Sequence, residues 1–182
     1  MFVIKSTLAV ALALQLGAAT SLAQEFPDVR ATLEFQRAAD SYAFMHRQAE
    51  RRLGLAHRKA GEAVNEIGSD ELAAAIRAER TRTSPGEFLT PAIAGVIGSR
   101  LIGARRSGCP LGELESGSRR VLRINGPATG TNQPPECVMA VLPYLPPELE
   151  YRSTDGVLVL VDGHANLVVD VLPGPLSLTS TR

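Results

Sequence analysis

The chain has 182 residues, with 19 basic and 19 acidic side chains and therefore no formal net charge at neutral pH. This balance gives no electrostatic reason to expect binding to nucleic acid or to an anionic membrane surface. Tryptophan is absent and aromatic residues make up only 4% of the chain, which argues against a stacking platform for bases or sugars.

The N-terminal segment, residues 1–23, has the pattern of a secretory signal peptide. Lys5 precedes an apolar run from Leu8 to Leu16, and small residues follow that run. We expect cleavage before Gln24, which leaves a single mature domain, residues 24–182, with one more acidic than basic side chain. The apolar run is too short to favour a membrane span, and none is predicted in the mature domain. The expected location is the bacterial periplasm or the external medium.

Three helices are predicted in the first half of the mature domain. The first covers residues 24–53, where apolar side chains recur every three or four positions. The second region covers residues 60–80, and Gly68-Ser69 leaves open whether it forms one helix or two. The third begins at Thr90, which suits the capping position before a proline, and ends near Gly108.

The rest of the chain is predicted to form short segments and then β structure. The Gly- and Pro-rich region 108–135 contains one predicted helical turn at 111–114 and one extended piece at 121–124. A short helix follows up to Val141, where prolines end it. Three extended runs joined by Asp-Gly turns then indicate hairpins: residues 149–153, 157–161 and 167–172.

The predicted fold class is therefore α+β. Three or more helices in the part covering residues 24–142 are expected to pack on a small antiparallel β-meander at residues 148–173. The middle strand is apolar on both faces, so we expect helices to cover it.

Cys109 and Cys137 are the only cysteines in the sequence. In an exported chain, an even pair of cysteines usually forms a disulfide. The spacing does not match the C-x-x-C pattern of a redox-active pair, so a structural disulfide is predicted.

The stretch VLVLVDGHANLVVDVL contains a small group of polar residues, Asp162, His164 and Asp170. Asp, Gly and Asn are the residues that a tight turn between two strands requires for its backbone angles. We therefore interpret this group as a turn with His164 exposed at its tip and Asp170 further along the next strand. One histidine and one nearby carboxylate make at most half of a metal site.

His46 and Glu50 are four residues apart and share one face of the first predicted helix, as two metal ligands would. A surface ion pair is the commoner outcome of this spacing. A metal site would need further ligands from a facing helix, for which Glu62 and Glu66 are the available carboxylates. No metal or other cofactor is therefore predicted, and the nearest candidate ligands are His46, Glu50, His164 and Asp162.

No catalytic residue is predicted either. The sequence contains no G-x-S-x-G or H-E-x-x-H motif, no phosphate-binding loop and no dinucleotide-binding fingerprint. These are the local patterns by which common hydrolases and nucleotide-dependent enzymes are recognised.

Two segments resemble a group of uncharacterised exported bacterial proteins: IRAERTRTSPGEFLTP, and NQPPECVMAVLPYLPPELEYRSTDGVLVLVDGHANLVVDVLP. That group has a helical N-terminal half and a closing LPPxLEYR…LVLVD…LVVDVLP hairpin. This chain departs from the group's pattern after Leu53, and its cysteine pair is not typical of the group. The resemblance implies an exported location and the fold described above. It contributes no functional residues, because the group has no known activity.

The leading functional hypothesis is a non-catalytic envelope or periplasmic protein that binds another protein or an apolar ligand. The free edge of the meander is one place where a partner strand would add. The first alternative is a small metal-dependent hydrolase that uses His46, Glu50 and a carboxylate of the second helical region. It is excluded if His46 and Glu50 face solvent or if no third ligand lies nearby. The second alternative is a self-associating structural component of the envelope, and the oligomeric state is left open.

Overall fold

The computed structural model describes residues 27–55, 66–111, 122–154 and 156–172. The predicted signal peptide and nearly all of the predicted helical turn at 111–114 lie outside these ranges. Within them, no helix is both long enough and apolar enough to cross a membrane.

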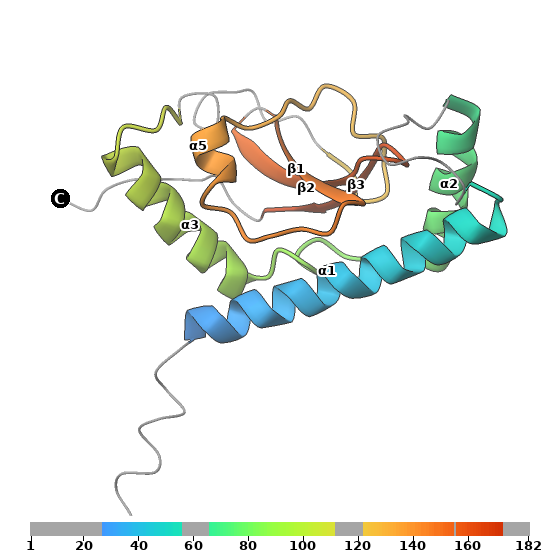
Figure 1. Cartoon of the computed structure of the whole chain (residues 1–182), viewed down its shortest axis with the longest axis horizontal. Helices are drawn as coiled ribbons and strands as arrows, with labels where there is room; N and C mark the ends of the chain where they lie inside the picture. Colours follow the sequence, from blue (N-terminus) through green and yellow to red (C-terminus); the bar gives the residue numbers. More distant parts are fainter. Residues whose placement is uncertain (1–26, 56–65, 112–121, 155, 173–182) are drawn as a thin grey trace, which may run out of the picture.

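Helices surround a small C-terminal sheet, so the predicted α+β class is confirmed (Figure 1). The long helix α1, Pro27–Arg52, runs along one side of the molecule. Helix α2, Glu66–Glu79, lies near the C-terminal end of α1, and helix α3, Pro91–Arg106, lies near its N-terminal end. The short helix α5, Glu136–Met139, packs between α3 and the sheet.

Helix α1 buries one face because its small and aromatic side chains recur at helical spacing. Its buried residues are Ala31, Phe35, Ala39, Tyr42, Ala43, His46 and Ala49. Phe35, Tyr42 and Ala49 belong to the predicted apolar face, and three further alanines and one polar residue, His46, complete the buried face. The presence of a histidine in this face is what places α1 in the candidate site described below.

Helices α2 and α3 differ in how well the sequence predicted them. Gly68 and Ser69 lie inside the continuous helix α2, so the helix has no break at these two residues. Helix α3 begins as predicted: Thr90 is its N-cap, its hydroxyl accepts from the backbone N–H of Ile93, and proline occupies the first turn.

The sheet has three antiparallel strands in the order β1-β2-β3, as the Asp-Gly turns predict. They cover Leu149–Thr154, Val157–Asp162 and Leu167–Val171. Gly156 adopts a φ of 78° in the first turn, which glycine tolerates without strain. The central strand β2 is buried along its length apart from Val157, as its apolar pattern predicts.

Loop segments pair with both outer strands and reduce the free edge that a partner strand would need. Ser153 of β1 exchanges two backbone hydrogen bonds with Asn132, at 2.7 and 2.8 Å. On the other side, Val168 of β3 accepts from the N–H of Asn125 and donates to the carbonyl of Gly126. The predicted extended piece at 121–124 forms no strand in its described residues, and the pairing comes from the residues just after it.

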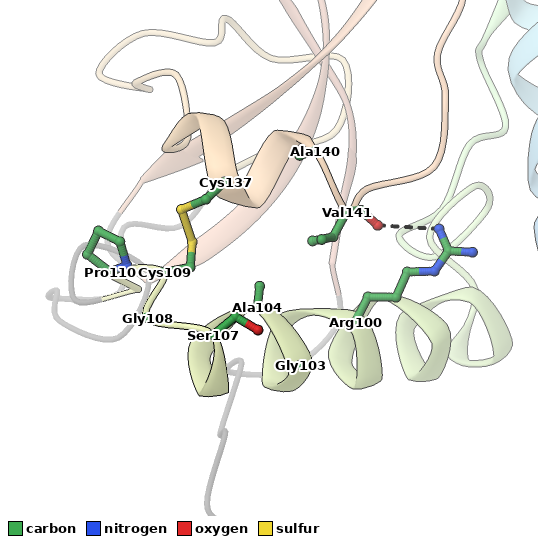
Figure 2. A pocket seen from close by; sticks show the side chains of 10 residues that line it. All are labelled: Arg100, Gly103, Ala104, Ser107, Gly108, Cys109, Pro110, Cys137, Ala140 and Val141. Carbon is green, nitrogen blue, oxygen red and sulfur yellow. Dashed lines mark hydrogen bonds between the residues drawn. A yellow bond between two sulfur atoms is a disulfide. The ribbon is translucent and has the colours of Figure 1, made fainter.

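Cys109 and Cys137 form the predicted disulfide, with a Cα–Cα distance of 5.9 Å (Figure 2). The bond joins the segment just after α3 to the short helix α5. It therefore connects a helix to the chain that leads into the sheet.

Candidate functional site

One candidate site is an open hollow of about 890 Å³ between α3 and α5, beside the disulfide (Figure 2). Its lining is mainly small and apolar and includes Ala104, Cys109 and Val141. The Arg100 guanidinium at one end donates a 3.3 Å hydrogen bond to the carbonyl of Val141. This surface would suit an apolar ligand, but it brings together no set of reactive or metal-binding groups.

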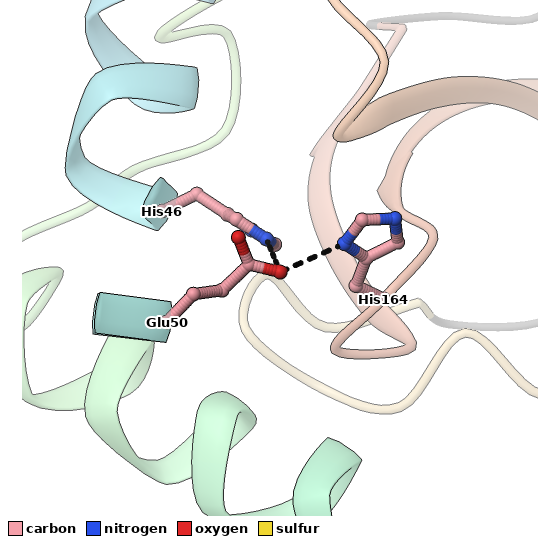
Figure 3. Close-up of side chains that lie close together, drawn as sticks. All are labelled: His46, Glu50 and His164. Carbon is pink, nitrogen blue, oxygen red and sulfur yellow. Dashed lines mark hydrogen bonds and ion pairs between the residues drawn. The ribbon is translucent and has the colours of Figure 1, made fainter. Parts of the chain in front are cut away.

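The second candidate site is a cluster of His46, Glu50 and His164 (Figure 3). His46 and Glu50 lie one turn apart on α1, and His164 lies in the turn between β2 and β3. Each residue offers one ligand atom, and the three atoms lie within 4.8 Å of one another. Residues separated by more than 110 positions in sequence therefore converge on one point.

The His46–Glu50 spacing was expected to give a surface ion pair, but both side chains are largely buried. The side chain of His46 is 0% exposed, and that of Glu50 is 17% exposed. The imidazole of His164 is 45% exposed, in agreement with its predicted place at the tip of the turn. Neither condition that would have excluded the metal-dependent hydrolase is met, because His46 and Glu50 do not face solvent and His164 is a third candidate ligand nearby.

Glu50 is the central member of the cluster. Its Oε1 lies 3.2 Å from His46 Nε2 and 3.1 Å from His164 Nδ1. The approach to His46 does not have hydrogen-bond geometry, and His46 Nε2 is a buried nitrogen without a hydrogen-bond partner. This nitrogen therefore faces a carboxylate at ion-pair distance inside the protein, and a cation could bind between the two groups.

The other ring nitrogen of His46 is held by Asp162. His46 Nδ1 lies 2.6 Å from Asp162 Oδ2, and both side chains are 0% exposed. The Tyr42 hydroxyl donates to the same oxygen at 2.7 Å. Burial disfavours the imidazolium, but the hydrogen bond and charge of Asp162 and the nearby charge of Glu50 outweigh this effect and raise the pKa of His46.

Asp162 was predicted to be a turn residue, and that role is also present. Its Oδ1 accepts from the backbone N–H groups of His164 and Ala165, at 3.0 and 2.8 Å. The sequence therefore predicted one function of this carboxylate correctly. It could not predict the contact of the second oxygen with α1, because that contact depends on how the helix packs against the sheet.

Asp162 is not placed to be a ligand in the same cluster. The two nitrogens of an imidazole point away from each other, and Asp162 contacts Nδ1 while Glu50 lies beside Nε2. Four candidate ligands were named from the sequence. Three of them, His46, Glu50 and His164, form the candidate site, and Asp162 contacts the opposite ring nitrogen of His46.

The geometry suits a tetrahedral zinc ion. Zinc bonds of about 2.0–2.1 Å place neighbouring ligand atoms about 3.3–3.4 Å apart. The separations of 3.1 and 3.2 Å between the Glu50 oxygen and the two histidine nitrogens are close to this value. The two histidine nitrogens are separated by up to 4.8 Å, so the two imidazoles would move toward each other around a bound ion. Two imidazoles and one carboxylate are also a ligand set that zinc uses.

The third polar residue of the turn region, Asp170, belongs to a structural contact and not to this cluster. Its carboxylate is fully buried and accepts backbone hydrogen bonds from Gly86, Phe88 and Leu89, at 2.7–2.8 Å. It thereby anchors the loop before α3 to strand β3. The carboxylates that were considered as partners for His46, Glu62 and Glu66, have side chains outside the described part of the structure.

Comparisons with protein-family models, with curated proteins and with solved structures find no match to this chain. The geometry of the chain itself is therefore the basis for a functional proposal.

Proposed function

We propose that the chain is an exported protein that binds one zinc ion through His46 Nε2, a Glu50 carboxylate oxygen and His164. The observation that carries this proposal is the convergence of His46 Nε2, Glu50 Oε1 and a ring nitrogen of His164 within 4.8 Å of one another, with His46 fully buried. Imidazole ligands favour zinc and related transition metals over calcium and magnesium, which prefer oxygen.

The contact between Asp162 and His46 supports the same proposal. Histidines that bind zinc usually donate their second ring N–H to a carboxylate or a carbonyl, which orients the ring and makes the ligand nitrogen more basic. The 2.6 Å contact from His46 Nδ1 to Asp162 has this arrangement. In a simple surface ion pair, His46 would contact Glu50 alone. Here its other ring nitrogen also contacts the fully buried Asp162.

Three features support the exported location. The first 23 residues have a signal-peptide pattern, a disulfide joins Cys109 to Cys137, and the sequence resembles exported bacterial proteins. Together they favour a periplasmic or secreted location for the proposed zinc-binding protein. In such a protein the metal also connects α1 to the β2–β3 turn, because its ligands come from both.

The proposal is tested by calorimetric titration of the metal-free, disulfide-bonded protein, residues 24–182, with Zn²⁺. We expect one site and a loss of affinity of at least about 100-fold in His164→Ala and in Glu50→Gln, because each change removes one direct ligand. Glu79→Gln is the matched control. It also removes a helix carboxylate that forms an ion pair, with Arg52 at 2.9 Å, but it leaves the cluster intact.

Absence of zinc binding by the wild-type chain would contradict the proposal. Equal affinity of the His164→Ala and wild-type proteins would also contradict it, since zinc would then be binding elsewhere. A parallel titration with Cu²⁺ provides a comparison metal, because copper binds most nitrogen sites more tightly than zinc does. Binding of Cu²⁺ without binding of Zn²⁺ would contradict the assignment of zinc.

A metal-dependent hydrolase is the second candidate function. The observation that favours it is the ligand set, because two histidines and one glutamate also hold zinc in several hydrolases. Zinc-dependent hydrolysis of an activated ester that disappears in His164→Ala would support it. The same rate with and without zinc would exclude it.

A further inference from the structure

Beyond the identity of the ligands, the structure indicates what holds them in place. We propose that Asp162 is the positioning residue for both histidine ligands, and that it makes Nε2 the metal-binding atom of His46. This inference rests on the proposed zinc site. It assigns two tasks to one carboxylate.

The first task concerns the proton on the His46 ring. An ionised carboxylate only accepts hydrogen bonds, so with Asp162 ionised the 2.6 Å contact places the ring proton on Nδ1. In the neutral ring, Nε2 then has a free lone pair, which faces Glu50. Since both side chains are fully buried, no water competes for this hydrogen bond.

The second task concerns the position of His164. Asp162 Oδ1 accepts from the backbone N–H groups of His164 and Ala165, which fixes the start of the turn that carries the His164 ring. The ring itself is about half exposed, and its contact with Glu50 at 3.1 Å is its side-chain hydrogen bond in the described structure. Its place beside Glu50 therefore depends on how the turn backbone is held.

The carboxylate that performs both tasks is itself fixed. Asp162 is the last residue of β2 and pairs with Leu149 of β1, and its Oδ2 accepts a second hydrogen bond from Tyr42. Every described hydrogen bond of this side chain thus leads to α1 or to the β2–β3 turn, the two elements that supply the metal ligands.

The test is the Asp162→Asn variant. Asparagine has nearly the same shape, and its carbonyl can still accept from the turn N–H groups. Its NH₂ group would then face His46 Nδ1 and favour the tautomer with the proton on Nε2, the ligand atom. We expect zinc affinity to fall about 10- to 100-fold, the range typical of lost outer-shell partners.

The matched control is Asp170→Asn. Asp170 is also a fully buried strand carboxylate that accepts several backbone hydrogen bonds, but it contacts none of the zinc ligands. We expect this variant to be less stable and to keep the zinc affinity of the wild-type protein. A purely structural role for Asp162 predicts the same behaviour for both variants.

A ¹⁵N NMR measurement of the histidine side chains provides a second readout, and its wild-type part does not depend on whether Asp162→Asn folds. In the metal-free wild-type protein with a neutral ring, we expect the proton of His46 on Nδ1. In the folded Asp162→Asn variant, we expect it on Nε2. A structural role alone would not exchange the two tautomers.

Two results would overturn the positioning role while leaving the zinc site in place: a wild-type His46 with its proton on Nε2, or wild-type zinc affinity in Asp162→Asn. A wild-type protein that binds no metal has a different meaning. It overturns the proposed function, even if the NMR data show the expected Nδ1 proton.

Discussion

Tyr42 and Tyr151 are both buried, but their hydroxyl groups have different surroundings. The Tyr42 hydroxyl donates to Asp162, whereas the Tyr151 hydroxyl has no hydrogen-bond partner in the described structure. Burial raises the pKa of both phenols, and the negative charge of Asp162 raises that of Tyr42 further. Removing each hydroxyl in turn therefore shows how much one buried hydrogen bond to a carboxylate contributes to the free energy of unfolding.

We predict that Tyr42→Phe lowers the free energy of unfolding at pH 7 by about 1–2 kcal/mol, because it removes a buried hydrogen bond to a charged group. Tyr151→Phe is expected to change it by less than about 0.5 kcal/mol or to raise it, because it removes a hydroxyl that is buried without a partner. Urea unfolding of both variants measures the difference. A larger loss in Tyr151→Phe than in Tyr42→Phe would contradict this account.

The same variants should respond to high pH. The unfolded phenols ionise near pH 10, while the raised pKa values keep the folded phenols neutral at that pH. The stability that depends on the neutral phenols is therefore complete below pH 10 and falls as the pH rises above it. Repeating the unfolding series at about pH 11 should show both phenylalanine variants gaining stability relative to the wild-type protein. An unchanged difference between pH 7 and pH 11 would contradict the burial argument.

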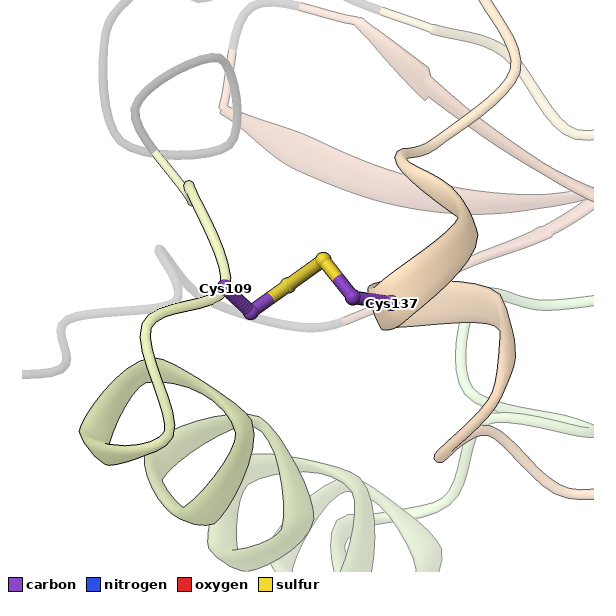
Figure 4. The surroundings of a disulfide bond; sticks show 2 residues. All are labelled: Cys109 and Cys137. Atoms are coloured by element: carbon purple, nitrogen blue, oxygen red, sulfur yellow. A yellow bond between two sulfur atoms is a disulfide. The ribbon is translucent and has the colours of Figure 1, made fainter.

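At the scale of elements, the disulfide joins the end of α3 to α5 (Figure 4). The two cysteines are 28 positions apart, and a bond that closes a loop of this size stabilises a fold by about 3–4 kcal/mol. Cys109 and the nearby Leu101 are buried in the same core as the sheet residue Leu160. The bond thus stabilises the helical layer and provides no ligand to the His46 cluster.

We predict that the double variant Cys109→Ser/Cys137→Ser loses about 3–4 kcal/mol of unfolding free energy, because its unfolded chain is no longer constrained. Its zinc affinity should remain that of the wild-type protein, provided that the measurement is made where the variant is folded. Circular dichroism during urea unfolding and a zinc titration measure the two quantities. A loss of zinc affinity in the folded variant would contradict this prediction and show that the disulfide affects the His46 cluster.

The elements that were predicted well have patterns that can be read within about 30 residues. The apolar face of α1, the Thr90 cap and the Asp-Gly turns of the meander are local signals, and the structure contains each of them. The break suggested at Gly68-Ser69 is absent from α2. A glycine inside a helix costs about 1 kcal/mol, and burial of Leu72 and Ile76 in the same helix outweighs this cost.

The candidate site was only partly predictable because its members come from distant parts of the chain. The sequence could show that His46 and Glu50 share a helix face and that His164 lies in a turn. It could not show that this face meets this turn, since the meeting depends on how α1 packs against the sheet. The one signal in the sequence was the spacing of His46, which lies four residues after Tyr42 and three before Ala49 and therefore on the apolar side of the helix. His46 was instead expected in a surface ion pair.

At the scale of the whole molecule, polar contacts join α1 to one end of the sheet. Tyr42 and His46 contact Asp162 at the end of β2, and Glu50 contacts His164 in the next turn. Arg47 adds an ion pair of 2.7 Å with Glu148, just before β1. These contacts bring four polar side chains of one helix to the same end of the meander, where the proposed zinc ion would complete the connection.

The measurement that tests this account most directly is a crystal structure of the protein with zinc, with anomalous diffraction recorded on both sides of the zinc absorption edge. We predict one strong anomalous peak about 2.0–2.2 Å from His46 Nε2, a Glu50 oxygen and a His164 nitrogen. Asp162 should still contact His46 Nδ1. A zinc peak elsewhere in the molecule, or a His46 Nε2 that remains unbound in zinc-saturated crystals, would contradict the account.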